Sequence, residues 1–168
     1  MTGSRFGLCL AAAILLCSCS PSAFGPAIGG LGPIFQAPDL EGKRIYLNDF
    51  LGDPIVVYFY ATWCGPCREE MIEMVEMEKD FAGRVKVIGV LIDPENSDRV
   101  RSLVIDLEIN HPILADQRGE IASAYGVNAL PRTFLIDQEG RIRSSLTGWG
   151  RSENAAVREM LKFMLMEQ

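Results

Sequence analysis

The stretch "VVYFYATWCGPCREEM", residues 56–71, joins three features that together limit the fold. It opens on a run of β-branched and aromatic residues, which is typical of a strand buried on both faces. Two cysteines follow, Cys64 and Cys67, with a Gly-Pro pair between them. A helix should begin at this pair, because proline is tolerated in a first helical turn. The stretch therefore predicts a buried strand, a loop that holds a dithiol, and a helix that runs to about Phe81.

Segments of the same kinds lie on both sides of this stretch. Residues 35–52 predict a hairpin around the turn Glu41-Gly42-Lys43, and residues 84–93 predict a second buried strand. The remaining predicted elements are an amphipathic helix around residues 100–107, a short strand at 111–116, a short helix at 119–126, a hairpin of 132–137 with 142–149, and a last helix capped by Ser152. Strands that alternate with helices indicate an α/β fold with a mostly parallel central sheet, to which the late hairpin adds an antiparallel edge.

The beginning of the chain has the pattern of a secretory signal. Arg5 is the only charged side chain in the first 38 residues, and the apolar run of residues 6–17 follows it. As a helix these residues would rise only about 18 Å, too little for a bilayer core of ~30 Å. We therefore predict a signal peptide at residues 1–18.

The end of this segment, "LCSC" at residues 16–19, resembles the lipobox of bacterial lipoproteins. The resemblance implies lipidation of Cys19, whereas Cys17 fits less well because bulky Leu16 would occupy the cleavage site. A plain signal peptide with an incidental cysteine and an uncleaved short anchor remain alternatives. We expect residues 19–33 to be a lipidated linker, rich in Gly, Pro, Ser and Ala, and residues 34–168 to be one domain.

Composition excludes some classes of function. The chain has 168 residues, of which 48% are hydrophobic and 23% charged, as in an ordinary globular protein. Its formal net charge is −6 and its basic residues are scattered, so a nucleic-acid partner is not expected.

The dithiol has several possible chemical roles. Cys64 should lie at a helix N-terminus, where free backbone N–H groups and the helix dipole favour the thiolate, which is the nucleophile. Cys67, one turn later, should be more buried and placed to attack a mixed disulfide at Cys64. A structural zinc site needs four ligands, but after the signal and Cys19 only two thiols and His111 remain. A structural disulfide would close too small a loop to stabilise the fold much. A copper relay through both thiolates and His111 is a further alternative, although the position of His111 before a proline favours a surface residue.

Together with the early hairpin, the stretches "VVYFYATWCGPCREEM" and "ALPRTFLIDQEGRI" resemble the thioredoxin superfamily, in particular its membrane-tethered TlpA/ResA-type branch. The resemblance covers residues 34–168 and implies a three-layer α/β/α sandwich, with a mixed central sheet and an N-terminal β-hairpin. It also implies Cys64 as the attacking thiol and Cys67 as the resolving thiol.

The same resemblance implies roles for other residues. Pro131 matches the family's cis-proline, which faces the dithiol, and Leu130 before it matches the backbone that pairs with substrate. Glu70 matches a glutamate of ResA-like members that can move the proton of the resolving cysteine. An acid in the first helical turn, stabilised by the dipole, is the alternative for Glu70. Trp63 is expected to cover the dithiol, or else to be an ordinary core residue.

Two positions depart from the family pattern. Tyr58 stands where thioredoxin has a buried aspartate, and tyrosine is too weak an acid to act as the same base. Arg132 stands where a threonine usually follows the cis-proline. It would favour acidic clients or lower a thiol pKa if it faced the dithiol, and it would do neither if it pointed to solvent.

These features predict an extracytoplasmic thiol-disulfide oxidoreductase that reduces envelope proteins such as apocytochrome c. We expect a lipid-anchored monomer facing the periplasm or the outer face of the cytoplasmic membrane. Its partners would be oxidised client proteins and a membrane electron donor, and it would use neither cofactor nor metal. A disulfide oxidase or isomerase and a copper-binding assembly factor are the alternatives.

Overall fold

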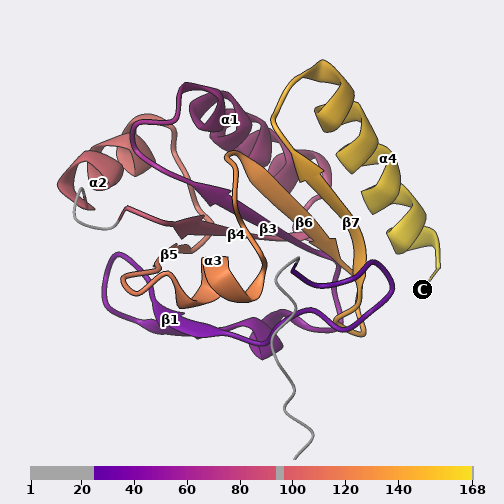
Figure 1. The fold of residues 1–168 in the computed structure, drawn as a ribbon. Coiled ribbons are helices and arrows are strands. Elements are labelled where there is room, and N and C mark those ends of the chain that lie inside the picture. The colour runs from indigo at the N-terminus through magenta and orange to yellow at the C-terminus, as the bar shows by residue number, and fades with distance from the viewer. Residues whose placement is uncertain (1–24, 94–96, 168) are drawn as a thin grey trace, which may run out of the picture.

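The computed structural model describes residues 25–93 and 97–167 of the chain, drawn in Figure 1. The predicted signal peptide, residues 1–18, and the predicted lipidation site, Cys19, lie outside the described residues. Within the described ranges, no helix is both long enough and apolar enough to cross a membrane.

A five-stranded mixed sheet with the strand order β5-β4-β3-β6-β7 forms the centre of the fold. Its strands are β3 (Ile55–Tyr60), β4 (Lys86–Leu91), β5 (Ile113–Ala115), β6 (Arg132–Ile136) and β7 (Ile142–Thr147). Strands β3, β4 and β5 run parallel, whereas β6 pairs antiparallel with β3, and β7 pairs antiparallel with β6. All residues of β3 are buried, as expected for a central strand covered on both faces. The predicted mixed sheet is confirmed.

Other elements cover both faces of this sheet (Figure 1). The helices are α1 (Gly65–Asp80), α2 (Ser97–Asp106), α3 (Glu120–Ala124) and α4 (Arg151–Met166). Because side chains alternate along a strand, Tyr58 and Tyr60 of β3 pack with α1, α2 and α4, whereas Val57 and Phe59 pack with α3 and the N-terminal hairpin. The three-layer sandwich is therefore confirmed, and α1 lies on the face that Tyr58 and Tyr60 share.

The predicted N-terminal hairpin consists of β1 (Gln36–Pro38) and β2 (Arg44–Tyr46), which pair antiparallel. Its turn is held by the Asp39 carboxylate, which accepts hydrogen bonds from two backbone N–H groups of the turn. Residues Leu47–Phe50 after β2 form a 3₁₀ helix (η1) in place of a longer strand.

Part of the expected linker lies against the domain. Gly29 donates a backbone hydrogen bond to Ile142, and Ile142 donates one back to Gly30. The Gly32 N–H donates to the carbonyl of Gly140, in the turn between β6 and β7. The segment that ends at residue 33 thus has an ordered part beside β7.

The start of α4 differs from the prediction. The helix begins at Arg151, its N-cap is Gly150, and no side chain caps it, so the prediction of Ser152 as the cap is wrong. The Ser152 hydroxyl instead donates to the carboxylate of Glu153 within the first turn. The predicted apolar stripe is confirmed by its buried residues, which are Val157, Leu161 and Met164.

Candidate active site

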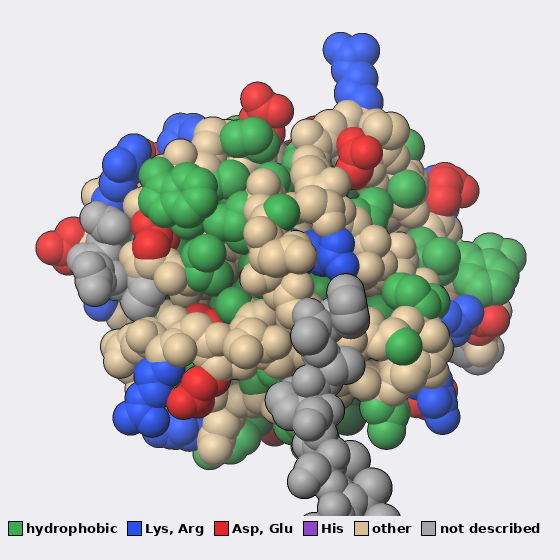
Figure 2. Space-filling model, viewed as in Figure 1, with side chains coloured by type: hydrophobic (Ala, Val, Ile, Leu, Met, Phe, Trp, Pro, Cys, Tyr) green, Lys and Arg blue, Asp and Glu red, His purple; other side chains and the backbone are tan. Residues whose placement is uncertain are grey.

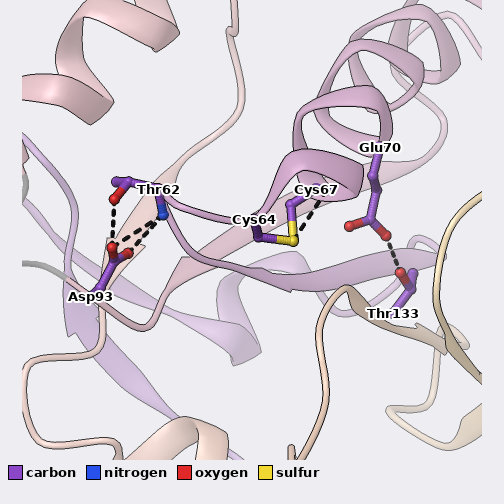
Figure 3. The surroundings of a disulfide bond; sticks show 6 residues. All are labelled: Thr62, Cys64, Cys67, Glu70, Asp93 and Thr133. Carbon is purple, nitrogen blue, oxygen red and sulfur yellow. Dashed lines mark hydrogen bonds between the residues drawn. A yellow bond between two sulfur atoms is a disulfide. The ribbon is translucent and has the colours of Figure 1, made fainter.

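The two cysteine sulfurs lie at the junction between β3 and α1. Cys64 is the N-cap residue of α1, in an extended backbone conformation, and Pro66 lies in the first turn. The backbone N–H of Cys67 donates to the Cys64 sulfur over 3.3 Å. A thiolate at Cys64 would therefore receive both a hydrogen bond and the positive end of the helix dipole. In this structure Cys64 and Cys67 form a disulfide (Figure 3).

The two cysteines differ in their access to solvent. Cys64 is 8% exposed and lines a surface pocket, whereas Cys67 is 1% exposed and faces the core beneath α1. A second protein can therefore reach the sulfur of Cys64 before that of Cys67, which is the order that the resemblance implies.

Glu70 lies one helical turn after Cys67 and is fully buried. Thr133 of β6 donates a hydrogen bond from its hydroxyl to Oε1, while Oε2 has no hydrogen-bond partner among the described residues. Figure 3 shows this carboxylate reaching Thr133, with its other oxygen directed back toward the disulfide. Burial raises the Glu70 pKa from 4.5 to about 8, although the bond from Thr133 opposes the shift. Glu70 lies beyond the first turn of α1, which contains no acidic residue, so the alternative of a first-turn acid stabilised by the dipole is wrong.

The peptide bond between Leu130 and Pro131 is cis, as the resemblance implies. In the β3–β6 register Phe59 pairs with Arg132, so this bond lies beside the end of β3 from which the Cys64 loop leaves. Pro131 is buried and Leu130 is half-buried. The roles of both in binding substrate stay predictions.

Trp63, directly before Cys64, is 69% exposed, so the alternative of an ordinary core residue is wrong. Its side chain lines the same surface pocket as Cys64 and leaves the ring largely open to solvent. Trp63 therefore adjoins the disulfide as a rim residue of the pocket.

Asp93 fixes the loop that leads to Cys64. Its carboxylate accepts two contacts from the Thr62 N–H, of 3.0 and 3.1 Å, and one from the Thr62 hydroxyl, of 2.6 Å (Figure 3). No sequence motif pointed to this residue. Its position two residues after β4, at the edge of the sheet where the dithiol loop begins, is the signal that could have identified it.

Tyr58 belongs to a buried hydrogen-bonded network. Its hydroxyl lies 2.8 Å from Nε2 of His111, and Nδ1 of His111 lies 2.9 Å from Oε2 of Glu78. The expectation that His111 is a surface residue is wrong, because it is 6% exposed and both ring nitrogens have partners. A copper relay through His111 would have to break one of these bonds.

Arg132 points neither toward the disulfide nor freely into solvent. Strand alternation places it on the face of Phe134, opposite to Thr133 and Glu70. Its guanidinium lies 5.0 Å from the Phe134 ring centroid and donates to the Ser145 hydroxyl over 3.1 Å. The expected influence of Arg132 on the dithiol therefore finds no support in its position.

Three features occur together at this site: an accessible cysteine that caps a helix, a buried cysteine one turn later, and a cis-proline beside them. They define a thioredoxin-like protein that carries out dithiol–disulfide exchange. Residues 28–145 match the model of the AhpC/TSA family, and the chain belongs to that family.

Similar proteins agree with this class. The thiol-disulfide oxidoreductase ResA of Bacillus thuringiensis subsp. konkukian is 37% identical over 121 residues, which cover 72% of this chain and 70% of that protein. ResA of Bacillus subtilis is 34% identical over 121 residues, covering 71% of this chain and 67% of that protein. The crystal structure of a putative thiol:disulfide interchange protein DsbE from Chlorobium tepidum superposes with a TM-score of 0.77 at 26% identity, and the match covers 83% of this chain and 99% of that one. The present protein is accordingly a thiol-disulfide oxidoreductase of the ResA type.

Proposed function

We propose that the protein reduces disulfides of client proteins outside the cytoplasm, while lipid at Cys19 holds it on a membrane. One arrangement supports the reaction above all others: an accessible sulfur at Cys64, an enclosed sulfur at Cys67, and a buried carboxyl group at Glu70. The location is supported by the predicted signal at residues 1–18 and by the lipobox-like residues 16–19.

The first step joins enzyme and client. The Cys64 thiolate attacks one sulfur of a client disulfide, a bond forms between the two proteins, and the other client sulfur leaves as a thiolate. The helix N-terminus and the Cys67 N–H stabilise the attacking thiolate and so raise its population at neutral pH.

The second step releases the reduced client. Cys67 transfers its proton to the ionised Glu70 carboxylate, and the resulting thiolate attacks the Cys64 sulfur of the mixed disulfide. The Cys64–Cys67 disulfide forms, the client sulfur leaves as a thiolate, and the client has gained two electrons. Burial raises the pKa of Glu70 to about 8, so only the minority of Glu70 that is ionised at neutral pH can accept this proton, and Glu70 then holds it in the disulfide form.

The direction of exchange depends on reduction potential, for which about 30 mV corresponds to 1.4 kcal/mol in a two-electron couple. The Cys-Gly-Pro-Cys sequence resembles that of strongly reducing members, so we assign the protein as a reductase. A membrane thiol-disulfide donor would then restore the dithiol. Apocytochrome c is the client class that we propose.

Two cysteine variants test this mechanism. Cys67→Ser should accumulate a mixed disulfide with its client, because the resolving sulfur is absent, and mass spectrometry of the trapped species would identify that client. Cys64→Ser should abolish the reduction of insulin. Full insulin-reducing activity in Cys64→Ser would disprove the assigned roles.

A potential measurement tests the direction. A dithiol potential near that of thioredoxin, about −270 mV, supports a reductase. A potential near that of the strong oxidant DsbA, about −120 mV, would instead make the protein an oxidase.

A further inference from the structure

The pocket beside Cys64 lies between α1 and α2 and has a volume of about 320 Å³. Trp63 and Cys64 line it from the dithiol loop and Arg68 from α1, while Arg99, Leu103 and Asp106 line it from α2. A client that presents its disulfide to Cys64 must place neighbouring residues over this pocket. In Figure 2, blue cationic side chains lie next to green apolar ones at the upper left, over the adjoining ends of α1 and α2.

The lining of this pocket carries more positive than negative charge, whereas the whole chain is negatively charged. Arg68 and Arg99 are both exposed, and neither forms an ion pair or hydrogen bond with any other residue that the structure describes. Asp106 is the single acidic residue in the lining, so the lining has a positive balance in a chain whose net charge is −6. Two guanidinium groups at one pocket, neither with a partner among the described residues, can bind an anionic ligand group.

The opposite flank of α1 has no such excess of positive charge. A second pocket, between α1 and the start of α4, is lined by Glu69, Glu73 and Arg151, and Arg158 pairs with Glu73 over 3.7 Å. Arg68 and Arg99 therefore place the excess positive charge near Cys64 on the side of α1 that faces α2. Such an asymmetry favours one orientation of a charged client.

We propose that the α1–α2 pocket binds an acidic side chain of the client, close in sequence to the client's reactive cysteine. This inference rests on the proposed function, because it concerns the substrate of the same sulfur. Guanidinium groups suit carboxylates, which they can bind through two parallel hydrogen bonds, and Trp63 and Leu103 offer apolar area to the stem of the same side chain. Clients with Asp or Glu beside the cysteine should therefore react faster than clients with Lys there.

Reporter peptides can measure this preference directly. Three fluorogenic peptides would contain the same disulfide-bonded cysteine and differ only in its two flanking residues, which are Glu, Gln or Lys. The second-order rate of their reduction by the fully reduced protein is the observable. We expect the Glu peptide to react about three- to tenfold faster than the Lys peptide at low salt, the range that two exposed ion pairs allow. The preference should nearly vanish in 1 M NaCl, where the Debye length is about 3 Å.

Charge-reversal variants locate the source of the preference. Arg68→Glu and Arg99→Glu should each lower the Glu-to-Lys rate ratio, and the double variant should bring it to one or below. The ratio is the proper readout, because a new charge near Cys64 also changes the reactivity of the thiolate toward every peptide. The matched control is Arg118→Glu, the same charge change at a side chain that is 83% exposed, in the loop before α3. It should leave the ratio unchanged.

The experiments distinguish a failure of the acidic-client inference from a failure of the proposed function. Equal rates for the three peptides, or a preference that survives the double variant, would overturn the acidic-client inference while the reductase function stands. A protein that reduces none of the peptides and no insulin would overturn the proposed function and this inference with it.

Discussion

Glu70 combines two properties that rarely occur together, complete burial and an oxygen without a hydrogen-bond partner among the described residues. A carboxyl group in such a place is more stable with its proton than without it. The same property that would suit Glu70 to the proposed role of holding the Cys67 proton also makes the folded state sensitive to pH.

This sensitivity can be measured in the oxidised protein, in which Cys64 and Cys67 do not titrate. Between pH 4.5 and about 8 the unfolded chain has lost the Glu70 proton and the folded chain has kept it. The free energy of unfolding should therefore fall as pH rises through this window, by on the order of a few kcal/mol. Glu70→Gln cannot titrate and should remove most of this fall. Urea unfolding at pH 5 and pH 8 tests the point, and equal pH dependence in both proteins would contradict it.

Tyr58 supplies a second prediction at the scale of single residues. Tyr58→Phe removes the hydroxyl that lies 2.8 Å from Nε2 of His111 and leaves a buried ring nitrogen without a partner. The variant should lose about 1–3 kcal/mol of stability in urea unfolding. Tyr46→Phe makes the same chemical change at a side chain that is 43% exposed, and it should alter stability little. Similar losses in the two variants would show that the network with His111 contributes nothing special.

At the scale of elements, close packing between strands explains a glycine in the middle of a buried strand. Gly89 of β4 pairs with Tyr58 on one side and with Ile113 on the other. A Cβ at Gly89 would lie 2.8 Å from the Tyr58 hydroxyl and 2.5 Å from Cδ1 of Ile113. The absence of a side chain here makes room for the Tyr58–His111 bond.

Gly89→Ala should therefore displace the Tyr58 ring and destabilise the fold by about 1–3 kcal/mol, the usual range for an overpacked core. Gly65→Ala is the matched control, because its Cβ would meet nothing within 4 Å. Urea unfolding of both oxidised variants gives the comparison. A Gly89→Ala protein as stable as the control would show that the strands can separate to accommodate the methyl group.

The helices and strands were predictable where the period of the hydrophobic residues and the length of the segment indicate the same kind of element. The run of β-branched and aromatic residues before Cys64 predicted a central strand, and the stripe on α4 was visible at a period of 3.6 residues. The predicted helix cap is wrong because the Gly-Trp-Gly loop ends at the N-cap Gly150, two residues before Ser152. The position of a helix cap depends on where the preceding loop ends. Residue preferences alone do not determine this position.

At the scale of the whole molecule, the site depends on contacts between distant parts of the chain. The motif around Cys64 predicted the dithiol, and the resemblance implied the cis bond at Pro131, which the structure confirms. The bond from Thr133 to Glu70 joins residues 63 positions apart, and it exists because β6 lies next to β3. The burial of His111 and the α1–α2 pocket likewise follow from packing, for which a single sequence contains no direct signal.

The attachment of the whole protein to a membrane is the last prediction, and the early cysteines provide its controls. If Cys19 is lipidated after removal of residues 1–18, the full-length chain should fractionate with membranes and incorporate labelled fatty acid. Cys19→Ser should abolish the label and release the protein from the membrane fraction if the signal is still cleaved. Cys17→Ser, which makes the same change two residues earlier, should keep both. Loss of the label in Cys17→Ser alone would show that Cys17 is the lipidated residue. Membrane retention without label in every variant would indicate an uncleaved anchor.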